Sequence, residues 1–275
     1  MQEQQLLKEK VKERYGKIAL TGNSGCSCSC CCCCTAQEEK SATENDGSSP
    51  IQSAKAVGYD NKDVESIPET SILGVGCGTP TKFADIKQGE VVVDLGSGAG
   101  IDVFLSANQV GKSGKVIGID MTDEMLEKAS SNAKDSNNYT SVVEFRKGDI
   151  EKAIPVEDNT ADLVISNCVI NLTTDKVSTF KEIRRILKND GGRMVISDLI
   201  ADREVVDKDS INLEKWCSCI DGALTKKDYL DKIRKSGFKN VEVLQEKPYI
   251  DEQEGNDKED TRRKISSLII KAIKD

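Results

Sequence analysis

The residues that decide the fold are VVVDLGSGAG at 91–100 and KVIGIDM at 115–121. The first stretch reads as an apolar strand that ends at Asp94 and leads into a glycine-rich turn and a helix. The second reads as the next strand, and it ends at another acidic residue, Asp120, about 20 residues further on. Two acidic strand ends at this separation are typical of α/β domains that bind an adenosine-containing cofactor. The sequence therefore predicts a nucleoside ligand.

The turn after Asp94 favours S-adenosylmethionine over a dinucleotide. A dinucleotide-binding turn follows G-x-G-x-x-G, whereas residues 96–100 are spaced G-x-G-x-G and Ile101 stands where the third glycine should be. The Asp94 carboxylate would repel a pyrophosphate but attract a sulfonium and its amino-acid tail. Asp120 is then expected to accept hydrogen bonds from the ribose, and Met121 to lie against adenine. The alternative is an ordinary strand-turn-helix whose glycines serve only the turn.

Length and charge narrow the class of protein. A chain of 275 residues suits one core domain with extensions. The net charge of -8 and the pI near 5.0 argue against nucleic acid or an anionic membrane surface as the main partner, because either would require a basic patch. The N-terminal sequence MQEQQLLKEKVKERYG is charged throughout, so it predicts neither a secretory signal nor a membrane span. We expect a cytoplasmic monomer.

Cysteine and histidine usage point to soft-ion chemistry. The chain has eleven cysteines, seven of them between Cys26 and Cys34, and no histidine. Such a run would form arbitrary disulfides in an oxidising compartment, whereas reducing conditions keep the thiols free. The absence of histidine excludes every His-based metal site and the usual general base. Any mechanism must work without imidazole.

The order of predicted elements indicates an α/β fold. Residues 1–20 read as a helix with an apolar stripe, followed by the cysteine cluster and by a polar linker over 35–53. From Gly89 onward strands and helices alternate, which is the pattern of a sheet covered on both faces. The predicted strands are 91–94, 115–120, 142–146, 161–166, 193–197, 241–244 and 265–270; the predicted helices include one after a Thr122 cap, one from a Thr174 cap towards Gly191–Gly192, and one over 224–236.

These elements predict a doubly wound, mostly parallel, seven-stranded Rossmann-like sheet with an N-terminal helix and a Cys-rich segment. We divide the chain into 1–53 (helix, Cys-rich cluster and linker), 54–245 (the nucleotide-binding domain, which carries the candidate site) and 246–275 (a charged loop over 251–264 and the last strand of the same sheet). No internal repeat is visible.

Three cysteines outside the cluster are placed to meet at one rim of the sheet. Cys168 follows the strand 161–166, at the carboxyl end where open α/β sheets bind their ligands. Cys77 lies in a glycine-flanked turn before the first strand, and Cys219 in the connection after strand 193–197. Taken singly, each could be a buried small hydrophobe. Together, beside a methyl donor, they suit trivalent arsenic, whose thiolate complexes have an exposed lone pair and no proton to remove.

Several segments resemble those of the arsenite methyltransferase family, within the class I S-adenosylmethionine-dependent methyltransferases. They are GVGCGTP, GEVVVDLGSGAGIDVFLSA, VGKSGKVIGIDMTDEMLEKA, VEFRKGDIE, DLVISNCVINL, RILKNDGGRMVISD and CSCIDGAL, and they cover roughly Leu73 to Phe238. The resemblance implies that Cys168 and Cys219 hold arsenite, with Cys77 as an added ligand or as half of a disulfide formed during turnover. The cofactor positions that it implies are Asp94, Gly96, Ser97, Gly98, Asp120, Met121, Asp149 and Ile150, with Asn167 beside them.

The same resemblance implies methylated arsenicals as products, arsenic detoxification as the role, and thioredoxin or glutathione as the thiol reductant. Family members carry a further upstream cysteine, for which Cys32–Cys34 are the best candidates, whereas Cys217 has no role by resemblance. Two other functions stay open: a thiol-rich metal-binding protein with an idle methyltransferase-like domain, and a methyltransferase for another small molecule. A dehydrogenase is disfavoured by Ile101 and Asp94.

Overall fold

The computed structural model describes residues 2–22, 49–135, 139–204, 216–249 and 263–275. The cysteine cluster at Cys26–Cys34, most of the predicted linker and residues 251–262 of the predicted charged loop lie outside the described residues. Within the described part of the chain, no helix is both long and apolar enough to cross a membrane.

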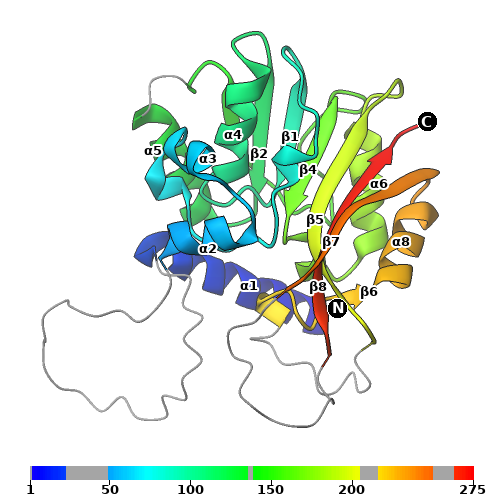
Figure 1. The fold of residues 1–275 in the computed structure, drawn as a ribbon. Helices are drawn as coiled ribbons and strands as arrows, with labels where there is room; N and C mark the ends of the chain where they lie inside the picture. The colour runs from blue at the N-terminus through cyan, green and yellow to red at the C-terminus, as the bar shows by residue number, and fades with distance from the viewer. Residues whose placement is uncertain (1, 23–48, 136–138, 205–215, 250–262) are drawn as a thin grey trace, which may run out of the picture.

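The structure is built around one mostly parallel sheet (Figure 1). Its strands are β1 (Val91–Leu95), β2 (Lys115–Asp120), β3 (Val143–Lys147), β4 (Leu163–Asn167), β5 (Arg193–Ala201), β7 (Asn240–Pro248) and β8 (Ile265–Ile273). They lie in the order β3-β2-β1-β4-β5-β8-β7, and the two-residue β6 (Leu224–Thr225) pairs with β5. The pairs among β1 to β5 are parallel, whereas β8 runs antiparallel to both of its neighbours. The predicted seven-stranded, mostly parallel sheet is confirmed.

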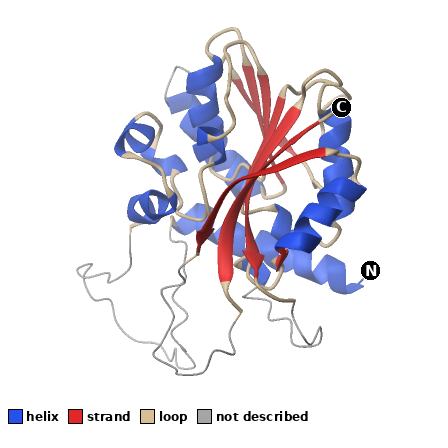
Figure 2. Ribbon diagram, turned by 45° about the vertical axis from the view of Figure 1, so that its right-hand side comes forward, coloured by secondary structure: helices blue, strands red, loops and turns tan. Residues whose placement is uncertain are grey.

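Helices cover both faces of this sheet (Figure 2). On one face α4 (Ile101–Val110) and α5 (Asp123–Asp135) pack through a core that includes Val103, Phe104 and Ala133. On the other, α6 (Lys176–Ile186) and α8 (Lys226–Lys235) contribute Phe180 and Tyr229 to a second core. The parallel strands β1, β2, β4 and β5 are mostly buried, which explains their nearly continuous apolar sequences, whereas the edge strand β3 is half-buried and more polar.

The segments outside this α/β unit pack on it. Helix α1 (Gln2–Thr21) crosses the end of the sheet, with Leu7, Val11 and Ile18 buried as its apolar stripe predicts (Figure 1). The short helices α2 (Pro50–Val57), α3 (Asn61–Glu65), η1 (Glu69–Ser71) and η2 (Pro80–Lys82) precede β1, and η3 (Ile170–Leu172) follows β4. The loop before β1 therefore reaches the same end of the sheet as α1.

Strand β4 begins two residues later than predicted, and β5, β7 and β8 extend past their predicted ends. Three helix starts also differ from the prediction, each because a neighbouring residue makes the better cap. The predicted linker does not extend to 53, because Ser49 caps α2 with a reciprocal hydrogen-bond pair to Gln52. Helix α6 begins after Asp175 rather than Thr174, because the Asp175 carboxylate accepts the Ser178 amide. The helix expected from Leu224 begins at Lys226, after a Thr225 cap.

Candidate functional site

The carboxyl ends of β1, β2 and β4 open into a cleft beneath α1. The cleft has a volume of about 820 Å³, including space open to solvent, which lies in the usual range for small-ligand sites. Its lining includes Gly96, Gly98, Asp120, Met121, Asp149, Ile150 and Asn167. A smaller cavity adjoins it and is lined by Asp94, Ser97, Asn167 and the same two glycines. Every cofactor position expected from the sequence thus lines one of two adjoining cavities.

Two acidic strand ends shape the glycine turn. The Asp120 carboxylate accepts the Gly98 amide at 3.0 Å and the Thr122 amide at 2.8 Å, so it ties the turn to the start of α5. Burial raises the pKa of Asp120. Burial also raises the pKa of Asp94 well above its usual value, and the nearby Asp102 and Asp120 carboxyls add to the effect. A cation placed in the smaller cavity would relieve this unfavourable burial.

A bound S-adenosylmethionine fits these cavities by the chemistry of their walls. The Asp94 carboxyl lines the smaller cavity and can receive the cationic amino group of the methionine tail. The Ser97 hydroxyl is buried there without a hydrogen-bond partner, which leaves it available to a ligand. The apolar side chains of Met121 and Ile150 line the larger cleft, where an adenine ring can pack.

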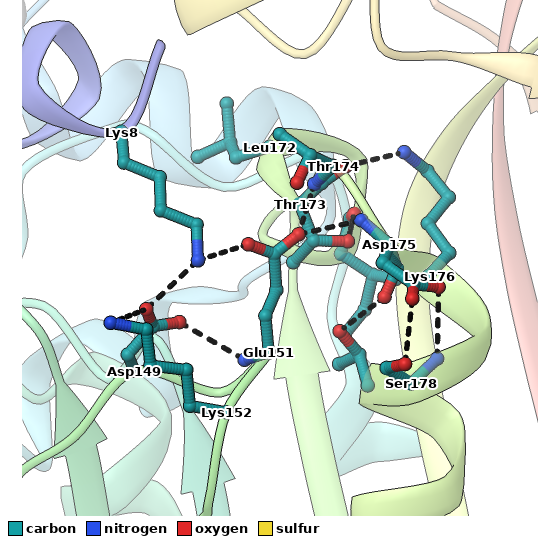
Figure 3. A network of polar contacts seen from close by, with 12 residues as sticks. Lys8, Asp149, Glu151, Lys152, Leu172, Thr173, Thr174, Asp175, Lys176 and Ser178 are labelled. Carbon is teal, nitrogen blue, oxygen red and sulfur yellow. Dashed lines mark hydrogen bonds and ion pairs between the residues drawn. The ribbon is translucent and has the colours of Figure 1, made fainter. Parts of the chain in front are cut away.

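Helix α1 is held over the cleft by an ion-pair network that the sequence did not predict (Figure 3). Lys8 bonds Asp149 at 2.8 Å and also pairs with Glu151. Glu151 in turn accepts the backbone amides of Thr174 and Asp175 before α6. Burial lowers the pKa of Lys8, but its bonds to the two carboxylates more than offset this and the net shift is upward. The network links α1, the expected adenine neighbour Asp149 and the start of α6.

The three predicted thiols gather beside this cleft. Cys77, Cys168 and Cys219 belong to one buried cluster, and all are free thiols. The Cys219 thiol donates to the Cys168 carbonyl at 3.0 Å, and the Cys168 thiol interacts with those of Cys219 and Cys77. Cys168 also lines the cofactor cleft, whereas Cys77 and Cys219 are not among its lining residues. Cys168 therefore stands at the boundary between the cleft and the thiol cluster.

The pKa values of the Cys168 and Cys219 thiols are both raised in this pocket. Hydrogen bonds with Cys219 and Cys77, together with burial, raise the pKa of Cys168 well above its usual value. The hydrogen bond with Cys168 lowers the pKa of Cys219, but burial and the nearby Asp198 and Cys77 raise it, and the net shift is upward. The free pocket therefore holds Cys168 and Cys219 as neutral thiols.

The Cys77 loop is positioned by glycines and by Asn167. A Cβ at Gly78 would lie 2.2 Å from the Ser197 hydroxyl, and one at Gly76 2.9 Å from the Asn167 amide nitrogen. Only glycine permits this approach. The Asn167 side chain accepts the Cys77 amide at 3.1 Å and donates to the Gly78 carbonyl at 2.9 Å. Asn167, expected from the sequence to lie at the cofactor, thus also holds a thiol in place.

A buried polar network fixes Asn167 itself. Its amide nitrogen donates to Asp102 at 3.0 Å and to the Tyr59 hydroxyl at 2.9 Å, and that hydroxyl donates to Asp102 at 2.8 Å. Burial raises the pKa of Asp102 to about 6, although these hydrogen bonds and one from Thr81 oppose the shift. The network joins α4 to the end of β4.

Sequence reasoning missed Asp198, which lies beside the thiols. One ligand atom from each of Cys77, Cys168 and Asp198 lies within 4.8 Å of the other two. Burial raises the pKa of Asp198 to about 7, while Lys176 and three hydrogen bonds lower it. The sequence contained a signal for Asp198, because it follows the apolar run VIS in β5 much as Asp94 and Asp120 follow the apolar runs of their own strands.

Cys217 is also buried, and its carbonyl, not its thiol, accepts the Tyr15 hydroxyl at 3.2 Å.

Comparison with known proteins identifies the relatives of this chain. Residues 86–237, more than half of the chain, match the family described as "Methyltransferase domain". The arsenite methyltransferase of Halobacterium salinarum is 39% identical over 240 residues, which cover 86% of this chain and 58% of that protein. That of Aquipseudomonas alcaligenes is 37% identical over 186 residues, 66% of this chain and 53% of that protein. The chain thus spans about half the length of these curated relatives.

A solved structure agrees with these matches. An arsenic(III) S-adenosylmethionine methyltransferase from Chlamydomonas reinhardtii superposes with a TM-score of 0.63 at 32% sequence identity. The superposition covers 80% of this chain and 72% of that one. The fold of that protein therefore extends over most of this chain.

Proposed function

We propose that this chain, which belongs to the arsenite methyltransferase family of S-adenosylmethionine-dependent methyltransferases, transfers methyl groups to arsenite held by Cys168 and Cys219. Cys77 serves as the third sulfur ligand or forms a transient disulfide during turnover. The products are methylated arsenicals, methylarsenite is the substrate of a second round, and the role is arsenic detoxification.

The position of Cys168 carries the proposal. Its side chain lines the cleft that fits the methyl donor and also contacts two further thiols. When bound, S-adenosylmethionine supplies an electrophilic methyl group on a cationic sulfur. The lone pair of arsenic bound at Cys168 would face that cleft. Positioning and exclusion of water would then supply most of the catalysis. No general base is needed, because arsenic has no proton to lose.

The roles of the other residues follow from where they lie. Asp94 and Ser97 orient the methionine tail, Asp120 binds the ribose while it holds the glycine turn, and Met121 and Ile150 pack on the adenine. Asp149 lies at the adenine edge and is tied to α1 by Lys8. Asn167 keeps the Cys77 loop next to the cofactor cavity. An external thiol reductant, thioredoxin or glutathione, returns the oxidised enzyme or intermediate to the reduced state, and the protein acts as a monomer.

The test is incubation of the purified protein with arsenite, a thiol and S-adenosylmethionine, followed by speciation of the arsenic products. We expect methylarsenicals from the wild type and none from Cys168→Ser or Cys219→Ser. Both variants should still bind S-adenosylmethionine in calorimetry. Cys217→Ser is the matched control and should keep its activity. Arsenite-dependent methylation that persists in either of the first two variants would refute the site. Tight metal binding by a wild type that never consumes S-adenosylmethionine would favour a thiol-rich binding protein instead.

A further inference from the structure

Asp198 is a buried acidic group in the thiol pocket to which the function proposed above gives no task. It lies on β5, and only 1% of its surface is exposed. One carboxylate oxygen accepts the Asn171 amide at 2.9 Å and the Tyr229 hydroxyl at 3.0 Å. The other accepts the Leu199 amide at 3.0 Å. Three donors thus hold the carboxylate in one orientation, and they oppose the rise in its pKa that burial causes.

The Asp198 carboxylate lies close to the thiols but outside the cofactor cavities. Cys168 lines the cleft, whereas Asp198 lines neither of the two cavities. One Asp198 oxygen is nevertheless within 4.8 Å of the Cys77 and Cys168 sulfurs. An arsenic atom shared by these sulfurs would therefore lie near the buried carboxylate, whereas the methyl donor would lie in the cleft.

Methyl transfer moves a positive charge towards this carboxylate. Arsenic bound by three thiolates is neutral. As its lone pair forms the bond to carbon, the carbon–sulfur bond of the donor breaks and leaves its electron pair on sulfur. The donor sulfur changes from a cationic sulfonium to a neutral thioether, and arsenic, oxidised by two electrons, becomes the cationic centre. A fixed negative charge next to arsenic is therefore worth more in the transition state than in the ground state.

We propose that the Asp198 carboxylate stabilises the positive charge that arsenic acquires as it takes up the methyl group. This inference rests on the arsenite methyltransferase function proposed above. Three other carboxyls near the cleft, those of the buried Asp94 and Asp102 and of Asp120, line the cofactor cavities. They lie where the positive charge starts, so among these four carboxyls only Asp198 favours its transfer to arsenic.

One cationic side chain also acts on Asp198. Lys176 on α6 is buried, and its amine donates to the carbonyls of Asn171 and Thr173 at 3.3 and 3.0 Å. Its ammonium lies 5.7 Å from the centre of the Trp216 ring. Backbone carbonyls and the aromatic ring thus hold the Lys176 side chain. Its positive charge opposes the rise in the pKa of Asp198 that burial causes, while the three hydrogen bonds orient the carboxylate.

The test separates arsenite binding from methyl transfer. Arsenite binding is followed without S-adenosylmethionine by the fluorescence of Trp216, the single tryptophan of the chain, whose carbonyl accepts the Cys219 amide. Methyl transfer is measured in a single turnover with bound arsenite, so that product release does not mask the chemical step. Asp198→Asn is the main variant, and Tyr229→Phe removes only one donor to the carboxylate.

We expect Asp198→Asn to bind arsenite within about threefold of the wild type and to slow the single-turnover rate roughly 10- to 100-fold. Tyr229→Phe should give a smaller decrease of the same kind. Asp202→Asn, a partly exposed acid just after β5 that accepts the Lys264 amide, is the control and should match the wild type.

Three results would overturn the inference. They are an unchanged single-turnover rate in Asp198→Asn, a loss of arsenite binding as large as the loss of rate, and a decrease in Asp202→Asn equal to that in Asp198→Asn. A wild type that binds arsenite but transfers no methyl group refutes the proposed function instead. The two failures are therefore distinguishable.

Discussion

The thiol of Cys219 donates a 3.0 Å hydrogen bond to the backbone carbonyl of Cys168, a residue 51 positions earlier in the chain. Both residues also have positive φ, 61° at Cys168 and 64° at Cys219. Non-glycine residues avoid this region because the Cβ crowds the following carbonyl. Two of the four non-glycine residues with positive φ in the described part of the chain are thus the positions proposed to hold arsenic, and backbone strain often occurs at functional sites.

This strain predicts an unusual stability order at Cys168. Glycine relieves the positive φ, so Cys168→Gly should be more stable than Cys168→Ala by about 1 kcal/mol. Chemical denaturation measures the two free energies of unfolding. At Cys77, which does not have a positive φ, the same pair is the control and should not show this order. Equal stability of the glycine and alanine variants at position 168 would show that the backbone there is unstrained.

Gly96 should tolerate no side chain. It has φ 68°, and a Cβ would lie 2.4 Å from a Val169 methyl group. Gly96→Ala should therefore lose about 2–4 kcal/mol of stability and weaken S-adenosylmethionine binding measured by calorimetry. Gly111 is the control, since its φ is 66° but a Cβ added there would have no other atom within 4 Å. Gly111 has ψ -171°, a conformation that essentially only glycine adopts, so Gly111→Ala should cost only this backbone strain of about 1–3 kcal/mol and leave cofactor binding intact.

The Lys8 network predicts a slower exit of the cofactor. Lys8→Met removes the half-buried bonds to Asp149 and Glu151, so S-adenosylmethionine should dissociate about 3- to 10-fold faster in stopped-flow measurements. High salt should reduce the difference. Lys12→Met, whose contact with Asp123 is exposed, should behave as the wild type. If both lysine variants release the cofactor at the wild-type rate, the network does not hold α1 over the cleft.

Asp102 should make stability fall as the pH rises. Its folded pKa is about 6, above the unfolded value of about 4. Between these values the folded state binds more protons than the unfolded state, so this contribution is complete below about pH 4 and is lost as the pH passes through about 6. The free energy of unfolding of the wild type should thus fall more steeply over this range than that of Asp102→Asn. Identical slopes in urea unfolding would contradict the assignment.

The fold was predictable because its signals are local. The apolar strands from Val91 and Lys115, and the acidic residues that end them, are read directly from the chain, and the sheet follows from their alternation with helices. The helix cap was harder to predict, because Thr174 and Asp175 are both good cap residues and only the structure shows that the Asp175 carboxylate accepts the Ser178 amide.

The site was predictable as a set of cysteines but not as a geometry. The positive φ of Cys168 and Cys219 could not be predicted, because neither residue is a glycine or an asparagine. The contact of Lys8 with Asp149 joins residues 141 positions apart, and no local pattern encodes such a pairing. Asp198 differs, since the rule applied to Asp94 and Asp120 would have found it. Asp102 and Tyr59 could not be paired with Asn167 before the topology was known.

Strand β8 is the last strand of the sheet to be synthesised, and it completes the thiol site. It inserts between β5 and β7, and the hydroxyl of Ser267 on β8 donates to the Cys77 carbonyl at 2.6 Å. Every other strand of the sheet leaves the ribosome before it. A nascent chain that still lacks β8 has an open edge on β5 and a Cys77 loop without this anchor. The pocket is therefore completed only after the rest of the sheet has been translated.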